Sequence, residues 1–230
     1  MLSLVLVSCQ EAVEKIPRTT VVVSVGAAGP ALQALMNFLP EGLTINLPAD
    51  WDTLDIETAM MGVLVDAQPC TSATCMVSTY TLPYDTVTGL YLPIDTTGFP
   101  MFLTLGAGDS VVVYSPEDTV TGVLPSCPGV VIDAAPDSIT MGSDMDLAWH
   151  YDAGNPDSVM VSVKIPGREA ITEIMSGSIT AYTVPGASLD TTGLASVSIS
   201  SLVFETEMAG ATPGSFILYT KSEFAPVVIY

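Results

Sequence analysis

Two groups of oxygen-bearing side chains are spaced as ligands of a hard cation would be. One group surrounds Trp51 and the other occupies the loop after Tyr151. Carboxylate and amide oxygens clustered in loops are the ligands that Ca²⁺ prefers, although neither group fits the EF-hand pattern. The simpler interpretation is that these are solvated turn residues that accept local hydrogen bonds, and calcium binding is the hypothesis to test against it. The candidate ligands are Asp50, Asp52, Asp55 and Glu57 in the first group and Asp152, Asn155 and Asp157 in the second.

Cys70 and Cys75 bracket a short polar loop. In an oxidising compartment they would form a local disulfide, which stabilises a fold by closing a loop in the unfolded chain. Cys127 is then left over. A zinc site is disfavoured, because zinc normally requires further Cys or His ligands and His150 is the single histidine.

Patterns typical of catalysis are scarce. A Ser/His/Asp arrangement would need His150, which follows Trp149 on a predicted strand and is expected on the exposed face of that strand. The sequence has no GxSxG elbow, and Gly26–Pro30 lacks the spacing of a phosphate-binding loop. Acidic residues are plentiful, but nothing selects a catalytic pair among them. We therefore expect a protein without enzymatic activity.

The chain is strongly acidic, and its few basic residues are unevenly placed. It has 25 Asp and Glu residues against 5 Lys and Arg residues, which gives a formal net charge of -20. Between Arg18 and Lys164 there is no Lys or Arg. Such a charge repels the phosphates of nucleic acids and anionic lipid headgroups. We expect no nucleic-acid partner, and contact with a membrane only through a lipid anchor.

The segment Leu6-Val7-Ser8-Cys9 resembles the lipobox of bacterial lipoproteins. In that family the cysteine thiol receives a diacylglycerol and the preceding signal peptide is removed, so the resemblance implies lipidation of Cys9. The segment departs from such leaders in its lack of Lys or Arg at the start and in its short apolar region. The alternative is an ordinary first strand with a buried free Cys9. On the lipoprotein interpretation residues 1–17 form the leader and tether, and the protein lies at the bacterial cell envelope, on its outer surface or outside the cell.

Most of the remaining chain has the composition of β-strands. Segments rich in Val, Ile, Thr and Tyr are separated by Gly and Pro. One helix is expected over Pro30–Leu39, where proline can open the first turn and apolar residues share one face. The strands predicted in the first half are Thr19–Val25, Leu43–Leu47, Met60–Val65, Met76–Leu82, Val111–Ser115 and Val130–Asp133.

The second half alternates apolar and polar residues more regularly. Residues 145–151 predict a strand with one buried face, and residues 159–163 repeat the pattern. Further along, the apolar positions change parity, which predicts a β-bulge near Ser200 and Ser201. Short strands at this spacing indicate β-sandwiches.

Four features of the first half recur in the same order in the second half, which indicates an internal repeat. The alternative is coincidence, because Val, Thr and Gly are abundant. On the duplication interpretation, domain 1 covers residues 18–127 and domain 2 covers residues 128–230, with a linker at Ser126-Cys127-Pro128-Gly129. The matching pairs are Trp51 and Trp149, Tyr80–Pro83 and Tyr182–Pro185, Thr88–Leu90 and Thr192–Leu194, and Tyr114 and Tyr219.

Three segments of the second half, Asp146–Trp149, Asp157–Val163 and Tyr182–Pro185, look like parts of the immunoglobulin-like modules of bacterial surface lipoproteins. The resemblance covers residues 136–230. It implies an all-β fold of two tandem immunoglobulin-like antiparallel β-sandwich domains, the first with a short helix insertion. It also implies an extracellular surface location, and it carries no functional residues to this chain.

Together these expectations describe a non-enzymatic surface lipoprotein that acts as a binding or spacer module, with a protein or polysaccharide partner. The alternative is a structural subunit of an extracellular filament or sheath. Such a subunit would self-associate by adding Leu2–Val7 or Ala225–Tyr230 as a strand to the exposed sheet edge of a neighbour.

Overall fold

The computed structural model describes residues 16–41, 43, 45, 57–94, 101–165 and 167–230. Strands make up 52% of the structure and helices 6%, which confirms the prediction of a mostly β protein. Within these ranges no helix has the length and apolar character needed to cross a bilayer.

The first half contains β1 (Thr19–Ala27), α1 (Ala28–Met36), β2 (Glu57–Val65), β3 (Gln68–Pro69), β4 (Thr74–Val77), β5 (Tyr80–Leu82), β6 (Tyr84–Asp85), β7 (Leu90–Tyr91), β8 (Ser110–Tyr114) and β9 (Thr119–Val123). The second half contains β10 (Val130–Ala134), β11 (Ser138–Ile139), β12 (Met145–Tyr151), β13 (Ser158–Lys164), β14 (Ile171–Ser176), β15 (Ala181–Val184), the short 3₁₀ helix η2 (Gly186–Ser188), β16 (Gly193–Glu205) and β17 (Phe216–Ile229).

Three β-sheets build the described part of the chain. The large sheet has ten strands, with a main order of β14-β13-β16-β17-β1-β2-β7-β6, and β11 and β3 pair with β17 and β2. Its strands β1 and β17 are parallel. A four-stranded sheet, β5-β4-β8-β9, and a three-stranded sheet, β10-β12-β15, are separate from it.

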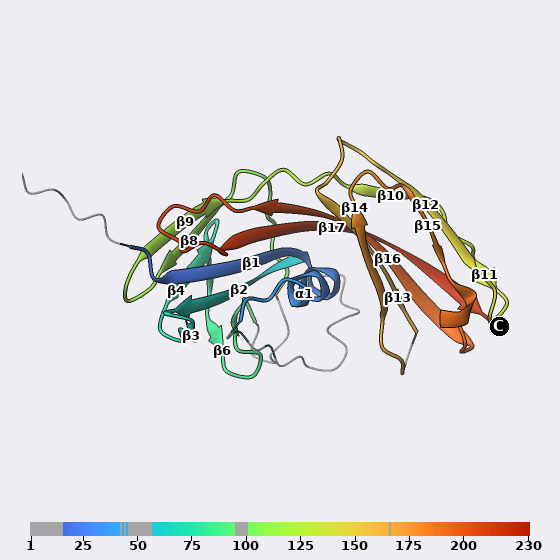
Figure 1. Ribbon diagram of the computed structural model, residues 1–230, viewed down its shortest axis with the longest axis horizontal. Coiled ribbons are helices and arrows are strands. Elements are labelled where there is room, and N and C mark those ends of the chain that lie inside the picture. Colours follow the sequence, from blue (N-terminus) through green and yellow to red (C-terminus); the bar gives the residue numbers. More distant parts are fainter. Residues whose placement is uncertain (1–15, 42, 44, 46–56, 95–100, 166) are drawn as a thin grey trace, which may run out of the picture.

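Two apolar cores lie on the same face of the large sheet, each under one small sheet (Figure 1). The first core lies between β1, β2 and the four-stranded sheet, and includes Val23 and Val113. The second core lies between β13, β16 and the three-stranded sheet, and includes Trp149 and Val161. Each half therefore has two packed layers of strands, as expected for chains whose strands alternate apolar and polar residues.

Strand β17 contributes to both cores from one side. Alternate residues of a strand point to the same side of the sheet, and on this side Ile217 lies in the first core and Ile229 in the second. Lys221 and Glu223 lie between them on the same side and are exposed. The pairing of β17 with β16 runs without interruption along the whole hairpin.

The expected tandem arrangement differs from this architecture. β17 pairs with β1, and Ile217 packs in the first core, so the large sheet crosses the expected boundary between residues 18–127 and 128–230. The physical reason is the length of β17, whose 14 residues extend over roughly 45 Å. A strand of that length reaches both cores. One sheet therefore contains strands from both sides of the expected domain boundary. A tandem immunoglobulin-like arrangement is not confirmed.

The predicted linker is packed against the sheet. Cys127 is 4% exposed, and its Sγ lies 3.2 Å from the Oγ of Ser201. The Ser201 hydroxyl donates a hydrogen bond to the carbonyl of Pro128. The segment between β9 and β10 is thus held against β16 where the two cores meet.

The predicted helix is present with different ends. It spans Ala28–Met36 instead of Pro30–Leu39. Leu35 is fully buried and packs with Val22 on the face of the large sheet opposite to the first core. Met36 was expected on the buried face, but it is 48% exposed.

The predicted bulge near Ser200 and Ser201 is absent, because β16 keeps one register with β17 along its whole length. The change of parity has another cause, which is that both faces of β16 are covered. Ile199 points into the second core, whereas Leu202 packs with Leu218 on the opposite face, near α1. The prediction was wrong because it assumed one solvated face.

The internal repeat remains a prediction. Tyr80–Leu82 and Tyr182–Val184 both contribute to edge strands of the small sheets. Tyr114 and Tyr219 do not correspond, since Tyr114 lies in a small sheet and is 50% exposed, while Tyr219 lies in the large sheet and is 2% exposed. Trp51 is outside the described residues.

Candidate functional site

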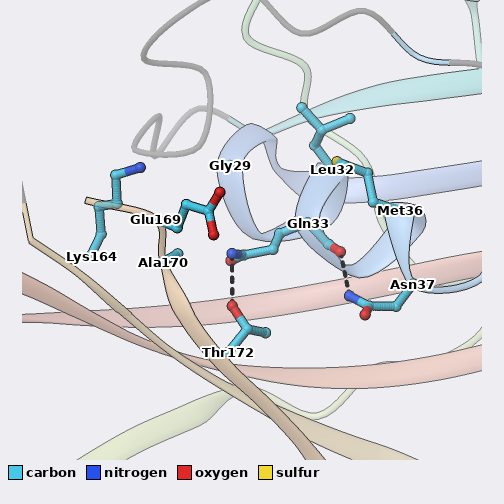
Figure 2. Close-up of a pocket in the computed structure, with 9 residues that line it drawn as sticks. All are labelled: Gly29, Leu32, Gln33, Met36, Asn37, Lys164, Glu169, Ala170 and Thr172. Atoms are coloured by element: carbon cyan, nitrogen blue, oxygen red, sulfur yellow. Dashed lines mark hydrogen bonds between the residues drawn. The ribbon is translucent and has the colours of Figure 1, made fainter. Parts of the chain in front are cut away.

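A pocket of about 410 Å³ lies between α1 and the β13–β14 edge of the large sheet. We call it the helix–sheet pocket. Leu32 and Met36 of α1 line one wall, and Ala170 and Thr172 line the other (Figure 2). Because the Met36 side chain is not buried between α1 and the large sheet, its thioether is available to a bound molecule.

One hydrogen bond joins the two walls of this pocket, and a second fixes the helix side. The Gln33 side-chain amide donates to the Thr172 hydroxyl at 2.8 Å, and the Asn37 side-chain amide donates to the Gln33 carbonyl at 2.8 Å. Figure 2 shows Lys164 and Glu169 on the strand side of the same pocket. The helix–sheet pocket therefore has a fixed, partly apolar wall with a charged rim, which suits reversible binding of a small molecule.

A second pocket, of about 460 Å³, lies where the two cores meet. We call it the junction pocket. It is bounded by the end of β1, the start of β2, the linker and the middle of β17. Its titratable side chains are Glu57, Cys127, Tyr219, Lys221 and Glu223.

Gly26 allows β1 and β17 to approach closely beside the junction pocket. Its φ is +142°, and a Cβ atom there would lie 2.0 Å from the Oγ1 of Thr220. That hydroxyl donates a hydrogen bond to the Val25 carbonyl at 3.2 Å. A larger residue at this position would push the two strands apart.

Glu57, the last residue of the first predicted calcium group, forms one side of the junction pocket. Its backbone carbonyl accepts a hydrogen bond from the Leu103 amide at 2.8 Å, and its carboxylate is hydrogen-bonded to the Tyr219 hydroxyl. The same hydroxyl donates to the Leu105 carbonyl at 3.2 Å. One hydroxyl proton thus serves two acceptors.

Burial disfavours charge on three groups of the junction pocket. It raises the pKa of the Glu57 carboxyl above its usual range, although the Lys221 ammonium and the Tyr219 hydroxyl act in the opposite direction. Burial raises the pKa of the Tyr219 phenol to about 12. It also raises the pKa of the Cys127 thiol to about 11, although the hydrogen bond between Cys127 and Ser201 acts in the opposite direction. Cys127 is therefore a protonated thiol at neutral pH and a poor nucleophile.

The second predicted calcium group makes backbone contacts to separate segments. Asp152 accepts a hydrogen bond from the Gly129 amide at 2.7 Å, and Asp157 accepts one from the Phe204 amide at 2.8 Å. Asn155 is exposed between them. Over the described ranges, no three or more His, Cys, Asp or Glu side chains are grouped to hold a metal ion. Both carboxylates accept hydrogen bonds, but from backbone amides distant in sequence and not from within their own turn, as the simpler interpretation expected. Calcium binding by this group stays a prediction.

Of the remaining predicted site residues, Asp50, Asp52, Asp55 and the lipidation candidate Cys9 lie outside the described residues. Cys70 and Cys75 are buried free thiols in the first core. Burial and the neighbouring Cys70 raise the pKa of the Cys75 thiol far above its usual range. Their disulfide stays a prediction.

The loop between Cys70 and Cys75 is fixed by Tyr91. The Tyr91 hydroxyl donates to the Cys70 carbonyl at 2.8 Å and accepts from the Ala73 amide at 2.8 Å. Sequence reasoning did not identify this contact, because Tyr91 approaches the loop only through the tertiary fold.

Sequence reasoning also missed both pockets. The available signals were the isolation of Lys221 among acidic residues and the polar interruption that Lys221 and Glu223 make in the apolar alternation of β17. Neither signal indicates what lies opposite, because Glu57 is distant in sequence.

In comparisons with known proteins, no family model and no curated protein sequence matches this chain. A function must therefore be argued from the pockets, the surface and the arrangement of the elements.

Proposed function

We propose that this chain is a non-enzymatic module of a bacterial cell surface, tethered through a lipid on Cys9, which acts as a binding or spacer module. The observation that carries the proposal is the placement of the chain's two ends. β1 begins at one end of the long axis and β17 finishes at the other (Figure 1). A tether preceding Thr19 would hold the first core near the membrane and direct the second core outward.

The outward end carries an exposed apolar patch that suits a partner. Leu194 and Val228 pair across β16 and β17, and they are 61% and 46% exposed. Tyr230 is 65% exposed beside them. Grouped apolar and aromatic side chains on a surface favour contact with a protein or with the apolar face of a sugar ring.

The tether is tested in a bacterial host with the full chain and its Cys9→Ser variant. We expect the parent protein in the membrane fraction, with the first eight residues removed and a diacylglycerol-sized mass increment on Cys9. The variant should be released into the soluble fraction. Equal fractionation of the two, with no added mass, would exclude the lipid tether.

A filament subunit is the second candidate, and the edge strand β14 favours it. β14 ends the main strand order of the large sheet, so one side of it is open to an added strand. Of the two predicted donor segments, Ala225–Tyr230 is already largely paired, with β16 on one side and β11 on the other. Leu2–Val7 lies outside the described residues. This candidate predicts polymers that grow with protein concentration and that disappear when Leu2–Val7 is deleted.

A further inference from the structure

Lys221 differs from the other basic residues of the described chain. Arg18 pairs with Asp66 and Glu117, Arg168 pairs with Asp190 at 3.1 Å, and Lys164 also has a partner. Among the described residues, the Lys221 ammonium group has no carboxylate within 4.0 Å. Lys221 is also exposed, so its ammonium group is accessible to a bound molecule.

Glu57 and Lys221 lie on β2 and β17, the two strands that flank β1 in the large sheet. Glu57 of β2 pairs with Ala27 of β1. The printed parallel pairing of β1 with β17 ends with Val25 opposite Tyr219. Ala27 and Lys221, each two residues further along its strand, both line the junction pocket. Because Ala27 has a small side chain and separates the two charges, it forms the floor between them. Strands two apart in a sheet are about 10 Å from each other.

The two charges therefore attract across the junction pocket without meeting. Both side chains line it, and the Lys221 ammonium acts on the Glu57 carboxylate. Direct contact would be favourable by Coulomb's law, but the two groups belong to strands that β1 separates. A ligand that lies above Ala27 can reach both.

At the Glu57 end of the pocket, the Tyr219 hydroxyl is a hydrogen-bond donor to the carboxylate. The single proton of the Tyr219 hydroxyl serves both the Glu57 carboxylate and the Leu105 carbonyl. Acceptor capacity is therefore left over, and an ammonium group, with three N–H donors, would satisfy it.

The charges around the pocket restrict the ligand further. A simple anion is repelled by the net charge of -20 and by Glu223 at the pocket. A simple cation is attracted by Glu57 and Glu223, but it leaves the Lys221 ammonium group without a counter-charge. A molecule that carries both charges meets an opposite charge at each end.

We propose that the junction pocket binds a small zwitterion of the amino-acid type, with its ammonium group at Glu57 and its carboxylate at Lys221. This site goes beyond the proposed function, since it requires neither the lipid tether nor the helix–sheet pocket.

The test is calorimetric titration of the full chain at about 0.15 M salt, where long-range charge effects are screened. The probes are glycine, β-alanine, 4-aminobutyrate and 6-aminohexanoate, with propylamine and propionate as single-charge analogues. We expect one zwitterion to bind at least about tenfold more tightly than either analogue. Equal binding of propylamine and of every zwitterion, or no binding of any probe, would overturn the proposal.

Variants locate the site. Glu57→Gln and Lys221→Gln should each remove the preference for the zwitterion, while the charge-matched controls Glu207→Gln and Arg168→Gln keep it. Glu57→Asp retains the charge with a shorter reach, and should move the preference to a longer probe. Circular dichroism confirms that each variant is folded. Unchanged binding in Glu57→Gln and Lys221→Gln would show that the zwitterion binds elsewhere, which contradicts the proposal.

Discussion

Glu57 has its carboxyl group in surroundings that disfavour a negative charge. Its neighbours are a tyrosine hydroxyl, backbone carbonyls and a lysine held at a distance. The buried thiols show the same effect of burial, since Cys75 and Cys127 have raised pKa values. At the residue scale, the interior of this acidic protein favours the neutral forms of its acids.

Replacement of Glu57 by Gln should stabilise the folded protein at neutral pH. The folded-state pKa of Glu57 is raised, so stability falls as the pH rises through that pKa. Gln carries no charge and so removes this loss. We expect the free energy of unfolding to rise by at most about 1 kcal/mol, because the group is partly solvated. Urea unfolding at neutral pH and at pH about 4 measures it. The gain should vanish at the lower pH, and Glu207→Gln should show no gain at either.

The thiols of Cys75 and Cys127 should resist alkylation in the folded protein, because burial keeps them protonated. We expect reaction with iodoacetamide only after unfolding. The same unfolded, unreduced sample counts free thiols, and a count reduced by two would indicate the predicted Cys70–Cys75 disulfide. Rapid labelling of Cys127 in the native protein would contradict its packing against Ser201.

At the scale of elements, the sequence predicted that α1 is a helix, but it did not predict correctly which of its residues are buried. The three- and four-residue spacing of Leu32, Leu35, Met36 and Leu39 predicted the helix. The helix crosses the large sheet so that Leu35 is buried while Met36 lies at the helix–sheet pocket. That orientation depends on the sheet beneath, which a helical pattern alone does not describe.

Adjacent substitutions in α1 test this orientation. Leu35→Ala should reduce the free energy of unfolding by about 2–4 kcal/mol, because it leaves a cavity against β1 and β2. Met36→Ala is the matched control and should change it by less than about 0.5 kcal/mol, since the side chain is exposed. Chemical denaturation of both variants measures the difference. Similar losses would mean that the helix is rotated from the described position.

At the scale of the molecule, the β16–β17 hairpin joins the two cores. The first core takes Ile217 and Tyr219 from the far end of the chain. The second core is made entirely of residues from Val130 onward. The first core therefore depends on strands from the second half of the chain, whereas the second core contains no residue of the first half.

Fragments separate this architecture from two independent domains. A fragment of residues 18–127 should fail to fold, because it lacks β17 and therefore the parallel partner of β1. A fragment of residues 128–230 contains every residue of the second core and should retain cooperative structure. Circular dichroism and thermal melts of both fragments measure this. A cooperative melt of the 18–127 fragment would contradict the shared sheet.

The sequence by itself determined the high strand content, the presence of helix α1 and the solvation of one face of β12, because these follow from the local pattern of apolar and polar residues. It also determined the net charge of -20, from which we expect no nucleic-acid partner. Only the tertiary structure decided that one sheet serves both cores and that Glu57 and Lys221 face one pocket. The physical reason is that strand order and the parallel pairing of β1 with β17 depend on contacts between residues far apart in the chain, and the alternation within each strand is the same for any strand order.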